Sequence, residues 1–341
     1  MPAVPHWSLS DAVAATDSID LRFEIGAAVD APVVILEAQP SDDPVQWQRV
    51  LDRLAPLPVV TVAADGDIAD ATGDIDALVA AVLAHPHAAT TALQVLRSTS
   101  GSLTECLIVE SIAYAMLQAG PEHAAWINSR GQRVRSDTTP RVRSDANDTG
   151  ITITLTRPRL HNLLDRQGRD ELSAAFALAG LPGESRLVTW QAEGASFCAG
   201  GDPAEFGEVT DPPTAHTIRM AAGPSLQLAA IAHRTTARVH GACVGAGIEL
   251  AAFAGTVVAD PSTRFRLPEV TMGLIPGVGG TWSIARRIGC RRTLEWLLLD
   301  QDIDAETALR WGLIDEISTV ERTARIRSTR SITNTADTVE S

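Results

Sequence analysis

The chain has 341 residues with 28 basic and 42 acidic side chains, a formal net charge of −14, and it contains no lysine. A hydrophobic fraction of 45% beside 21% charged residues is ordinary for a folded protein, which excludes disorder of the whole chain. The length favours two domains. The excess of acid argues against binding to nucleic acid or to an anionic membrane surface, because both need clustered positive charge.

The charge is divided unevenly along the chain. Residues 1–130 hold 5 arginines and 17 acidic residues, a balance of −12, whereas residues 131–341 hold 23 arginines and 25 acidic residues, a balance of −2. This asymmetry predicts two parts with different roles. We expect an acidic α/β extension at 1–130, a linker at 131–149, a second folded domain at 150–317 and a polar tail at 318–341.

Targeting signals and metal motifs are not evident in the sequence. No positively charged segment precedes an apolar one near the N-terminus, so no signal peptide is predicted. No apolar run approaches the roughly 20 residues that span a bilayer, and we expect a cytoplasmic protein. The cysteines are too widely spaced for a metal or redox motif, so they are predicted to be reduced and no metal site is expected: Cys106, Cys198, Cys243 and Cys290.

The N-terminal part reads as strands and helices in alternation. Short apolar runs at 31–38 and 57–63 predict strands. Residues 74–84 predict a helix that ends at the His85–Pro86 step.

A further helix is predicted to begin after Ser102, which has capping-box spacing to Glu105. This helix ends before Gly120–Pro121. Apolar residues at helical spacing form one face of it: Ile108, Ile112, Ala115 and Met116.

Residues 131–149 contain almost no apolar side chain, which predicts the linker. Residues 151–156 (ITITLT) then alternate strictly, as expected for a strand with one buried face. Strands alternating with helices follow, which predicts βαβ units and a mostly parallel sheet. The predicted strands are 187–190, 237–240 and 256–259, and the predicted helical regions are 170–178, 214–233 and 245–254.

Three segments carry the candidate chemistry: residues 196–202 (SFCAGGD), 240–250 (HGACVGAGIEL) and 265–281 (FRLPEVTMGLIPGVGGT). The absence of lysine excludes a GxxxxGK[ST] phosphate loop, and no GxSxG motif occurs. The first two segments bring small residues to the ends of predicted strands, where backbone N–H groups can approach a ligand closely. Two N–H donors aimed at one oxygen would form an oxyanion hole.

Two glutamates follow in these segments. Glu249 stands between Ile248 and Leu250, and a carboxylate in such an apolar stretch is costly to bury unless it is paired or functional. Glu269 lies 20 positions further on. The residues alone leave a structural alternative open, because glycines at such turns often serve only to turn the chain and Glu249 also fits an exposed helix position.

Taken in this order, the three segments resemble the enoyl-CoA hydratase/isomerase (crotonase) superfamily. Residues 151–164 (ITITLTRPRLHNLL) resemble the opening strand of that family, and residues 304–317 (DAETALRWGLIDEI) resemble a later helix and turn. The resemblance covers about half the chain, from residue 150 to residue 317. It implies an α/β fold of ββα spiral layers with surrounding helices, here with an N-terminal α/β or helical extension.

The resemblance also implies site residues. The N–H groups of Gly201 and Ala246 would form the oxyanion hole, and Glu249 and Glu269 would hold the two acid/base positions of family hydratases. The positions that the resemblance places near the substrate and its CoA are Ala199, Asp202, Gly277, Arg157 and Arg159, with Arg166 a further candidate for the CoA phosphates.

The implied activity is addition of water to a 2-enoyl-CoA thioester, with no metal or redox cofactor and with a trimeric or hexameric homo-oligomer as the assembly. Two other reactions of the superfamily remain open, enoyl-CoA isomerisation and the cofactor-free oxygenation of an arylacetyl-CoA. A non-catalytic acyl-CoA-binding or assembly subunit is the third alternative. The presence of both glutamates favours hydration.

The resemblance does not account for the N-terminal extension. Family members begin near the strand at 151–156 and continue, after the turn at 312–315, with helices that cover the active site. Here about 150 residues precede the strand and a polar segment follows the turn. We therefore expect helices around 103–117 and 122–127 to cover the site.

Overall fold

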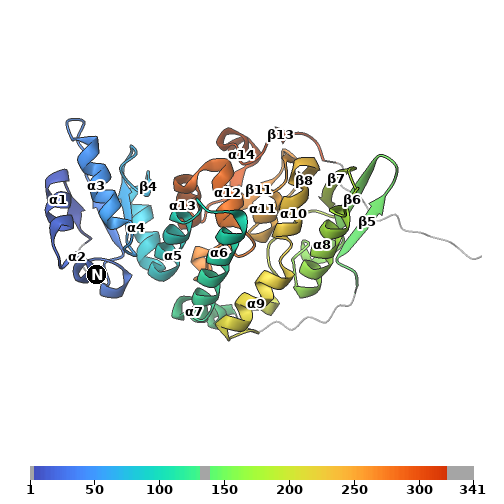
Figure 1. Cartoon of the computed structure of the whole chain (residues 1–341), viewed down its shortest axis with the longest axis horizontal. Coiled ribbons are helices and arrows are strands. Elements are labelled where there is room, and N and C mark those ends of the chain that lie inside the picture. The colour runs from blue at the N-terminus through green and yellow to red at the C-terminus, as the bar shows by residue number, and fades with distance from the viewer. Residues whose placement is uncertain (1–3, 131–138, 321–341) are drawn as a thin grey trace, which may run out of the picture.

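The computed structural model describes residues 4–130 and 139–320. The molecule is elongated, with an N-terminal sheet at one end and the first strands after residue 139 at the other (Figure 1). Helices of the N-terminal region continue from the first sheet into the middle of the molecule, where the motif-bearing segments lie.

The N-terminal sheet is parallel, with its strands in sequence order: β1 (His6–Trp7), β2 (Val33–Leu36), β3 (Val60–Ala63) and β4 (Ala71–Thr72). The strands predicted at 31–38 and 57–63 are thereby confirmed. Alternate residues of β2 divide between two cores: Val33 and Ile35 join the main core, and Val34 and Leu36 join a smaller second core with Trp47. Both faces of this sheet are therefore covered, as parallel strands require.

The N-terminal region also contains helices, and only the first five in chain order lie beside this sheet. The helices are α1 (Leu9–Asp17), α2 (Leu21–Glu24), α3 (Pro44–Leu54), α4 (Ile75–Ala84), α5 (Pro86–Arg97), α6 (Leu103–Gln118) and α7 (Pro121–Arg130). The helix predicted at 74–84 is confirmed as α4. A second helix, α5, was not predicted; it begins at Pro86 because proline fits the first helical position, where its missing N–H is not needed.

Helix α6 begins with the predicted capping box, in which Ser102 and Glu105 each bond the other's backbone N–H. Its predicted apolar face is largely not the buried one: the side chains of Ile112 and Met116 are 54% and 56% exposed, although Ala115 is buried. The opposite side, which includes Leu107, Glu110 and Leu117, is buried against the rest of the molecule. The helix is apolar over most of its circumference, so periodicity alone did not decide its orientation.

The largest sheet has six strands in the order β13–β10–β8–β7–β6–β5. Neighbouring strands are parallel except β5 and β6, and the bounds are β5 (Val142–Ala146), β6 (Gly150–Leu155), β7 (Leu187–Ala192), β8 (Thr235–Val239), β10 (Thr256–Ala259) and β13 (Glu316–Ile317).

Strand β5 corrects the predicted linker at 131–149, of which residues 131–138 lie outside the described part of the chain. Within the described part, β5 pairs antiparallel with β6, Val142 opposite Leu155. It is an edge strand whose side chains are mostly exposed, so it lacks the apolar alternation that would have identified it.

A three-stranded sheet, in the order β12–β11–β9, completes the second part. Its strands are β9 (Ala242–Val244), β11 (Arg264–Arg266) and β12 (Ile303–Asp304), and the remaining helices are α8 (Arg166–Ala179), α9 (Pro212–Ala222), α10 (Ser225–Ile231), α11 (Ala246–Ala251), α12 (Gly280–Ile288), α13 (Cys290–Leu299) and α14 (Ala305–Trp311). Strand β8 leads through β9 into α11, and β10 leads through β11 into α12. These repeats are the predicted ββα layers, and they confirm the expected α/β fold.

Three sequence-based expectations concern membrane spans, the cysteines and the C-terminal tail. Within the described residues no single helix is long and apolar enough to cross a membrane; α4 and α5 together meet that criterion, but they are bent by 107° at their junction. The four cysteines are free thiols, three buried and Cys290 exposed. The predicted tail at 318–341 lies outside the described residues from 321 onward.

Candidate active site

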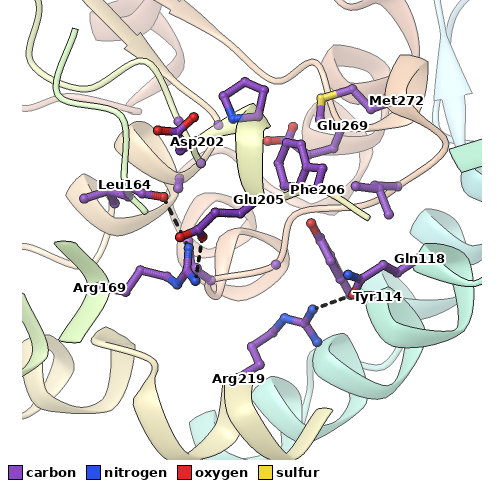
Figure 2. A pocket seen from close by; sticks show the side chains of 18 of the residues that line it. Tyr114, Gln118, Leu164, Arg169, Asp202, Glu205, Phe206, Arg219, Glu269 and Met272 are labelled. Atoms are coloured by element: carbon purple, nitrogen blue, oxygen red, sulfur yellow. Dashed lines mark hydrogen bonds and ion pairs between the residues drawn. The ribbon is translucent and has the colours of Figure 1, made fainter. Parts of the chain in front are cut away.

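A cavity of about 550 Å³ opens between the motif segments and the N-terminal helices. Its lining includes the four predicted site residues Gly201, Ala246, Glu249 and Glu269. Ala199, Asp202 and Gly277 also line it. Figure 2 shows Tyr114 pointing into this cavity from α6, with Arg169 and Glu205 on the opposite side.

The backbone of Gly201 and that of Ala246 are brought to the same end of the fold by one parallel bridge. Cys198 and Cys243 pair in this bridge, and the two candidate donors each lie three residues beyond it. Two bonds fix the pairing: Cys198 N–H donates to Ala242 O at 3.1 Å, and Val244 N–H donates to Cys198 O at 2.9 Å. Because Gly201 and Ala246 each follow a cysteine of this parallel bridge by three residues, both backbone amides lie beside the cavity.

Both amides are left available for a ligand. A second parallel bridge joins Leu164 to Gly201, and it uses the Gly200 carbonyl and the Asp202 N–H, so the Gly201 N–H points to the other side of the strand. Ala246 is the first residue of α11, where an N–H has no partner within the helix. Among the described residues neither amide donates a hydrogen bond.

Gly245, which precedes the second donor, is required by close packing as well as by conformation. Its φ is +51°, and a Cβ at this position would lie 2.7 Å from the Glu269 Oε1. A side chain here would therefore displace the Glu269 carboxyl group as well as strain the turn into α11.

Glu249 lies on α11 with only 3% of its surface exposed. Its Oε2 accepts hydrogen bonds from Val278 N–H at 2.9 Å and Gly280 N–H at 3.1 Å. Burial raises the pKa of this carboxyl group well above its usual range, and the nearby Glu269 and Glu110 add to the effect by charge repulsion. The two N–H donors act in the opposite direction, because they stabilise the carboxylate.

Glu269 follows β11 and is 7% exposed. Burial raises its pKa to about 8, and repulsion from Asp300 and Glu110 adds to this shift. Its Oε2 is buried and has no hydrogen-bond partner among the described residues. An unpartnered buried oxygen favours the neutral, protonated carboxyl group. Both carboxyl groups in the cavity therefore have a raised pKa, and they differ in their surroundings: amides donate to Glu249, whereas one oxygen of Glu269 has no partner among the described residues.

The N-terminal helices supply part of the cavity wall. Tyr114 and Gln118 on α6 and Trp126 and Arg130 on α7 line it. The Tyr114 ring packs so closely on the backbone of Gly277 that a Cβ there would lie 2.6 Å from two ring carbons. Both helices in which we expected a cover for the site, around 103–117 and 122–127, thus contribute to the cavity wall, and their role as a cover stays a prediction.

Tyr114 and Arg219 form a polar corner of the cavity. The guanidinium of Arg219, on α9, lies 4.1 Å from the centre of the Tyr114 ring. It donates to Gln118 Oε1 at 3.3 Å and to Ser111 O at 3.2 Å. Burial raises the pKa of Tyr114 to about 12, so its hydroxyl stays neutral and can donate a hydrogen bond.

The structure does not bring Arg157 and Arg159 into the cavity. Arg157 is 6% exposed and its Nη1 pairs with Asp202 at 3.0 Å and Asp165 at 3.1 Å. Asp202 lines the cavity but its carboxylate is held by this pair and by Ala204 N–H at 3.0 Å. Arg157 thus braces the loop that carries Gly201 and lies outside the cavity lining, which corrects its predicted place beside the substrate. Arg159 is exposed and stands outside the lining.

Other arginines do face the cavity. They are Arg130, Arg166, Arg169 and Arg219. Arg169 pairs with Glu205 at 3.0 Å, whereas the exposed Arg166 approaches Glu208 only to 3.9 Å. Of the candidates that the sequence offered for the CoA phosphates, Arg166 is the one that the fold places at the cavity.

Comparison with known proteins identifies the family. Residues 145–337, more than half of the chain, match the family described as enoyl-CoA hydratase/isomerase. The chain belongs to the enoyl-CoA hydratase/isomerase family. A protein of Rhodobacter capsulatus named "Probable enoyl-CoA hydratase" is 35% identical over 176 residues, which are 51% of this chain and 67% of that protein.

Solved structures of enoyl-CoA hydratase/isomerase relatives also match. An enoyl-CoA hydratase of Mycobacterium smegmatis is 27% identical, with a TM-score of 0.48, over 53% of this chain and 71% of that one. A chain of Geobacillus kaustophilus named "Enoyl-CoA Hydrates Subunit I" is 29% identical, with a TM-score of 0.49, over 52% of this chain and 69% of that one.

Several residues in and around the cavity were not identified from the sequence: Glu110, Tyr114, Trp126, Arg130 and Arg219. One signal could have revealed the first of them. Glu110 shares a side of α6 with Leu107, Tyr114 and Leu117, so a single acid stands in an otherwise apolar helical stripe.

Proposed function

We propose that this chain adds water across the 2,3 double bond of a 2-enoyl-CoA thioester. One observation carries the proposal: two buried glutamates line the same cavity as two residues whose backbone N–H groups donate no hydrogen bond among the described residues. Membership of the enoyl-CoA hydratase/isomerase family supports the CoA thioester as the substrate class. Water addition transfers no electrons, so the proposed reaction needs no redox cofactor.

The backbone donors would bind the thioester carbonyl oxygen. When water adds at C3, negative charge moves onto this oxygen as an enolate. Gly201 N–H and Ala246 N–H would stabilise that charge without reorganising, because the parallel bridge at Cys198 and Cys243 already fixes them.

The two glutamates would divide the proton transfers. Glu249, whose carboxylate form is supported by Val278 N–H and Gly280 N–H, would take a proton from the attacking water. Glu269, whose buried Oε2 has no hydrogen-bond partner among the described residues, would deliver a proton to C2. Water oxygen becomes bonded to C3, one proton reaches C2, and the enolate returns to a thioester.

The decisive experiment follows the absorbance of the enoyl thioester with crotonyl-CoA. We expect the band to decay on addition of the wild-type protein and the rate to fall by about 10²–10⁴ in Glu249→Gln and Glu269→Gln. Calorimetry should show that both variants still bind the thioester. Glu193→Gln is the matched control, because Glu193 is 6% exposed and pairs with Arg143 outside the cavity.

Three results would contradict the proposal. Retained crotonyl-CoA absorbance with oxygen uptake on an arylacetyl-CoA would assign oxygenation, and migration of the double bond without water addition would assign isomerisation. Binding without turnover of any thioester would assign a non-catalytic subunit.

The backbone donors can be tested separately. Ala246→Pro deletes one N–H at the first position of α11, which tolerates proline. We expect a fall of about 10²–10³ in turnover. Ala246→Ser retains the N–H and should remain within a few fold of the wild type; equal losses in both variants would contradict a donor role.

A further inference from the structure

Helix α6 of the N-terminal region places a third carboxylate beside the site. Glu110 is 2% exposed, and its Oε1 accepts a hydrogen bond from Gly279 N–H at 2.6 Å. Its Oε2 accepts from Thr281 N–H at 3.0 Å and from the Thr281 hydroxyl at 2.6 Å. A residue far away in sequence thus binds the loop that leads into α12.

The carboxyl groups of Glu110 and Glu249 accept hydrogen bonds from alternate backbone amides of that loop. Val278 N–H and Gly280 N–H donate to Glu249, and Gly279 N–H and Thr281 N–H donate to Glu110. These amides surround the start of α12, where helical N–H groups lack internal partners. Four consecutive donors are therefore shared between two carboxyl groups, so the position of one carboxyl group depends on the other.

We propose that Glu110 is a positioning residue that acts through this shared loop to fix the Glu249 carboxyl group in the cavity. The inference deepens the proposed hydration and rests on it for its kinetic consequences. Glu110 itself stands behind the cavity wall and outside its lining, and the three hydrogen bonds described above all come from Gly279 and Thr281. The N-terminal region thereby contributes to the orientation of a catalytic group as well as to the cavity wall.

The charge of Glu110 also acts on its neighbours. The charged and titratable groups that face it are Arg219 on α9, Glu249 on α11, Glu269 after β11 and Cys106 on α6 itself. Burial raises the pKa of Glu110 to about 7, so it is partly ionised near neutral pH. Its negative charge raises the pKa of Glu249, and removal of that charge should lower it.

The kinetic test compares Glu110→Gln, Glu110→Asp and a matched control. Glutamine removes the charge and can accept only through one oxygen, which leaves one loop N–H without an acceptor. We expect kcat with crotonyl-CoA to fall by about 10²-fold while KM stays within a few fold. Aspartate keeps the charge but shortens the reach, so an intermediate kcat is expected. Glu122→Gln is the control, because Glu122 likewise accepts from two amides, His87 and Ala88, at the start of α5.

A pH titration by NMR measures the coupling between Glu110 and Glu249 without the need for enzymatic turnover. The amide signals of Val278 and Gly280 should follow the ionisation of Glu249 with pH. Their midpoint should move down by about one pH unit in Glu110→Gln. It should stay near the wild-type value in Glu110→Asp and in Glu122→Gln. If Glu110→Gln does not fold, Glu110→Asp still tests the inference. Its kcat should fall while the pH midpoint of the Val278 and Gly280 amide signals stays near the wild-type value.

The outcomes separate the inference from the proposed function. A wild-type protein that hydrates no thioester but shows the midpoint shift would refute hydration and leave the link between Glu110 and Glu249 intact. An active wild type with unchanged kcat and midpoint in Glu110→Gln would overturn the inference alone. A raised KM at unchanged kcat would also overturn it, because Glu110 would then bind substrate.

Discussion

The first 130 residues contain two parts that relate to the cavity differently. The sheet part (residues 4–72) contains the second core, which includes Trp47 and Leu54, in addition to its share of the main core, and none of its residues lines the cavity. The helical part (residues 75–130) shares the main core with the second half of the chain and lines the cavity through α6 and α7. The part of the chain that forms the cavity therefore begins within the N-terminal region, at the helical part, and not at the start of the second half.

This division explains why the charge asymmetry along the chain predicted the boundary of the functional unit only in part. The strongly acidic half contains Tyr114, which lines the cavity, and Glu110, which binds the loop that Glu249 also holds. The sheet part also contacts the second half, through Val33, Ile35 and Ala71 in the main core and through Thr72 N–H, which donates to Glu295 Oε1 at 2.8 Å, but these contacts lie away from the cavity.

The largest expected effect comes from removal of both parts. A chain that begins at residue 139 would expose the surfaces that Leu93, Leu107 and Leu117 now cover in the main core. We expect it to aggregate and to show no hydration of crotonyl-CoA, as measured by size-exclusion chromatography and absorbance. A soluble, fully active truncated protein would show that the helical part is dispensable.

Two tryptophans test the difference between the parts directly. Trp47 is 2% exposed in the second core, so Trp47→Ala should lower the free energy of unfolding by about 3–5 kcal/mol. Its kinetic constants should not change at temperatures where the variant is folded.

Trp126 lines the cavity, where Arg130 lies 4.1 Å from the centre of its ring. Trp126→Ala should raise KM by about tenfold and destabilise the protein less than Trp47→Ala. Denaturant unfolding and steady-state kinetics measure both. If Trp47→Ala altered KM as strongly as Trp126→Ala, the division would be wrong.

The stability of the protein should depend on pH through Glu269. Glu269 has a folded-state pKa of about 8 against an ordinary value of 4.5. The stability that this raised pKa contributes is therefore fully present below about pH 4.5 and is lost as pH rises through about 8.

Thermal unfolding of the wild type and of Glu269→Gln across this range measures the effect. The wild type should lose stability relative to the variant between about pH 5 and pH 8.5, by about 1.4 kcal/mol for each unit of pKa difference. Parallel stability profiles would contradict the raised pKa.

The smallest effect is expected at the cavity entrance. Arg166→Gln should raise the KM for crotonyl-CoA by about two- to fivefold at unchanged kcat, because an exposed arginine gives a weak contact to a phosphate. The exposed Arg159 is its matched control and should have no effect when changed to glutamine. Equal changes in both would remove the distinction that the fold makes between them.

The sequence predicted the parts of the site that depend on local backbone pattern. The positions of Gly201, Ala246, Glu249 and Glu269 follow from short motifs at strand ends, and the fold brings all four to one cavity. Their chemical roles stay predictions until the variants are measured.

Contacts between distant segments were beyond the reach of local pattern. Arg157 stands in a motif, yet its partner Asp202 is 45 positions away, and only the fold shows that the two neutralise each other. Glu110 meets a loop 169 positions away. The orientation of α6 also depended on tertiary packing, since both of its sides carry apolar residues.

The central claim is that α6 and the motif segments form one active site. A crystal structure with a bound, non-hydratable acyl-CoA tests it most directly. We expect the thioester oxygen to lie within hydrogen-bond distance of Gly201 N–H and Ala246 N–H, with the acyl chain in contact with Tyr114. A thioester bound away from these amides, or an acyl chain that touches no residue of α6 or α7, would contradict it.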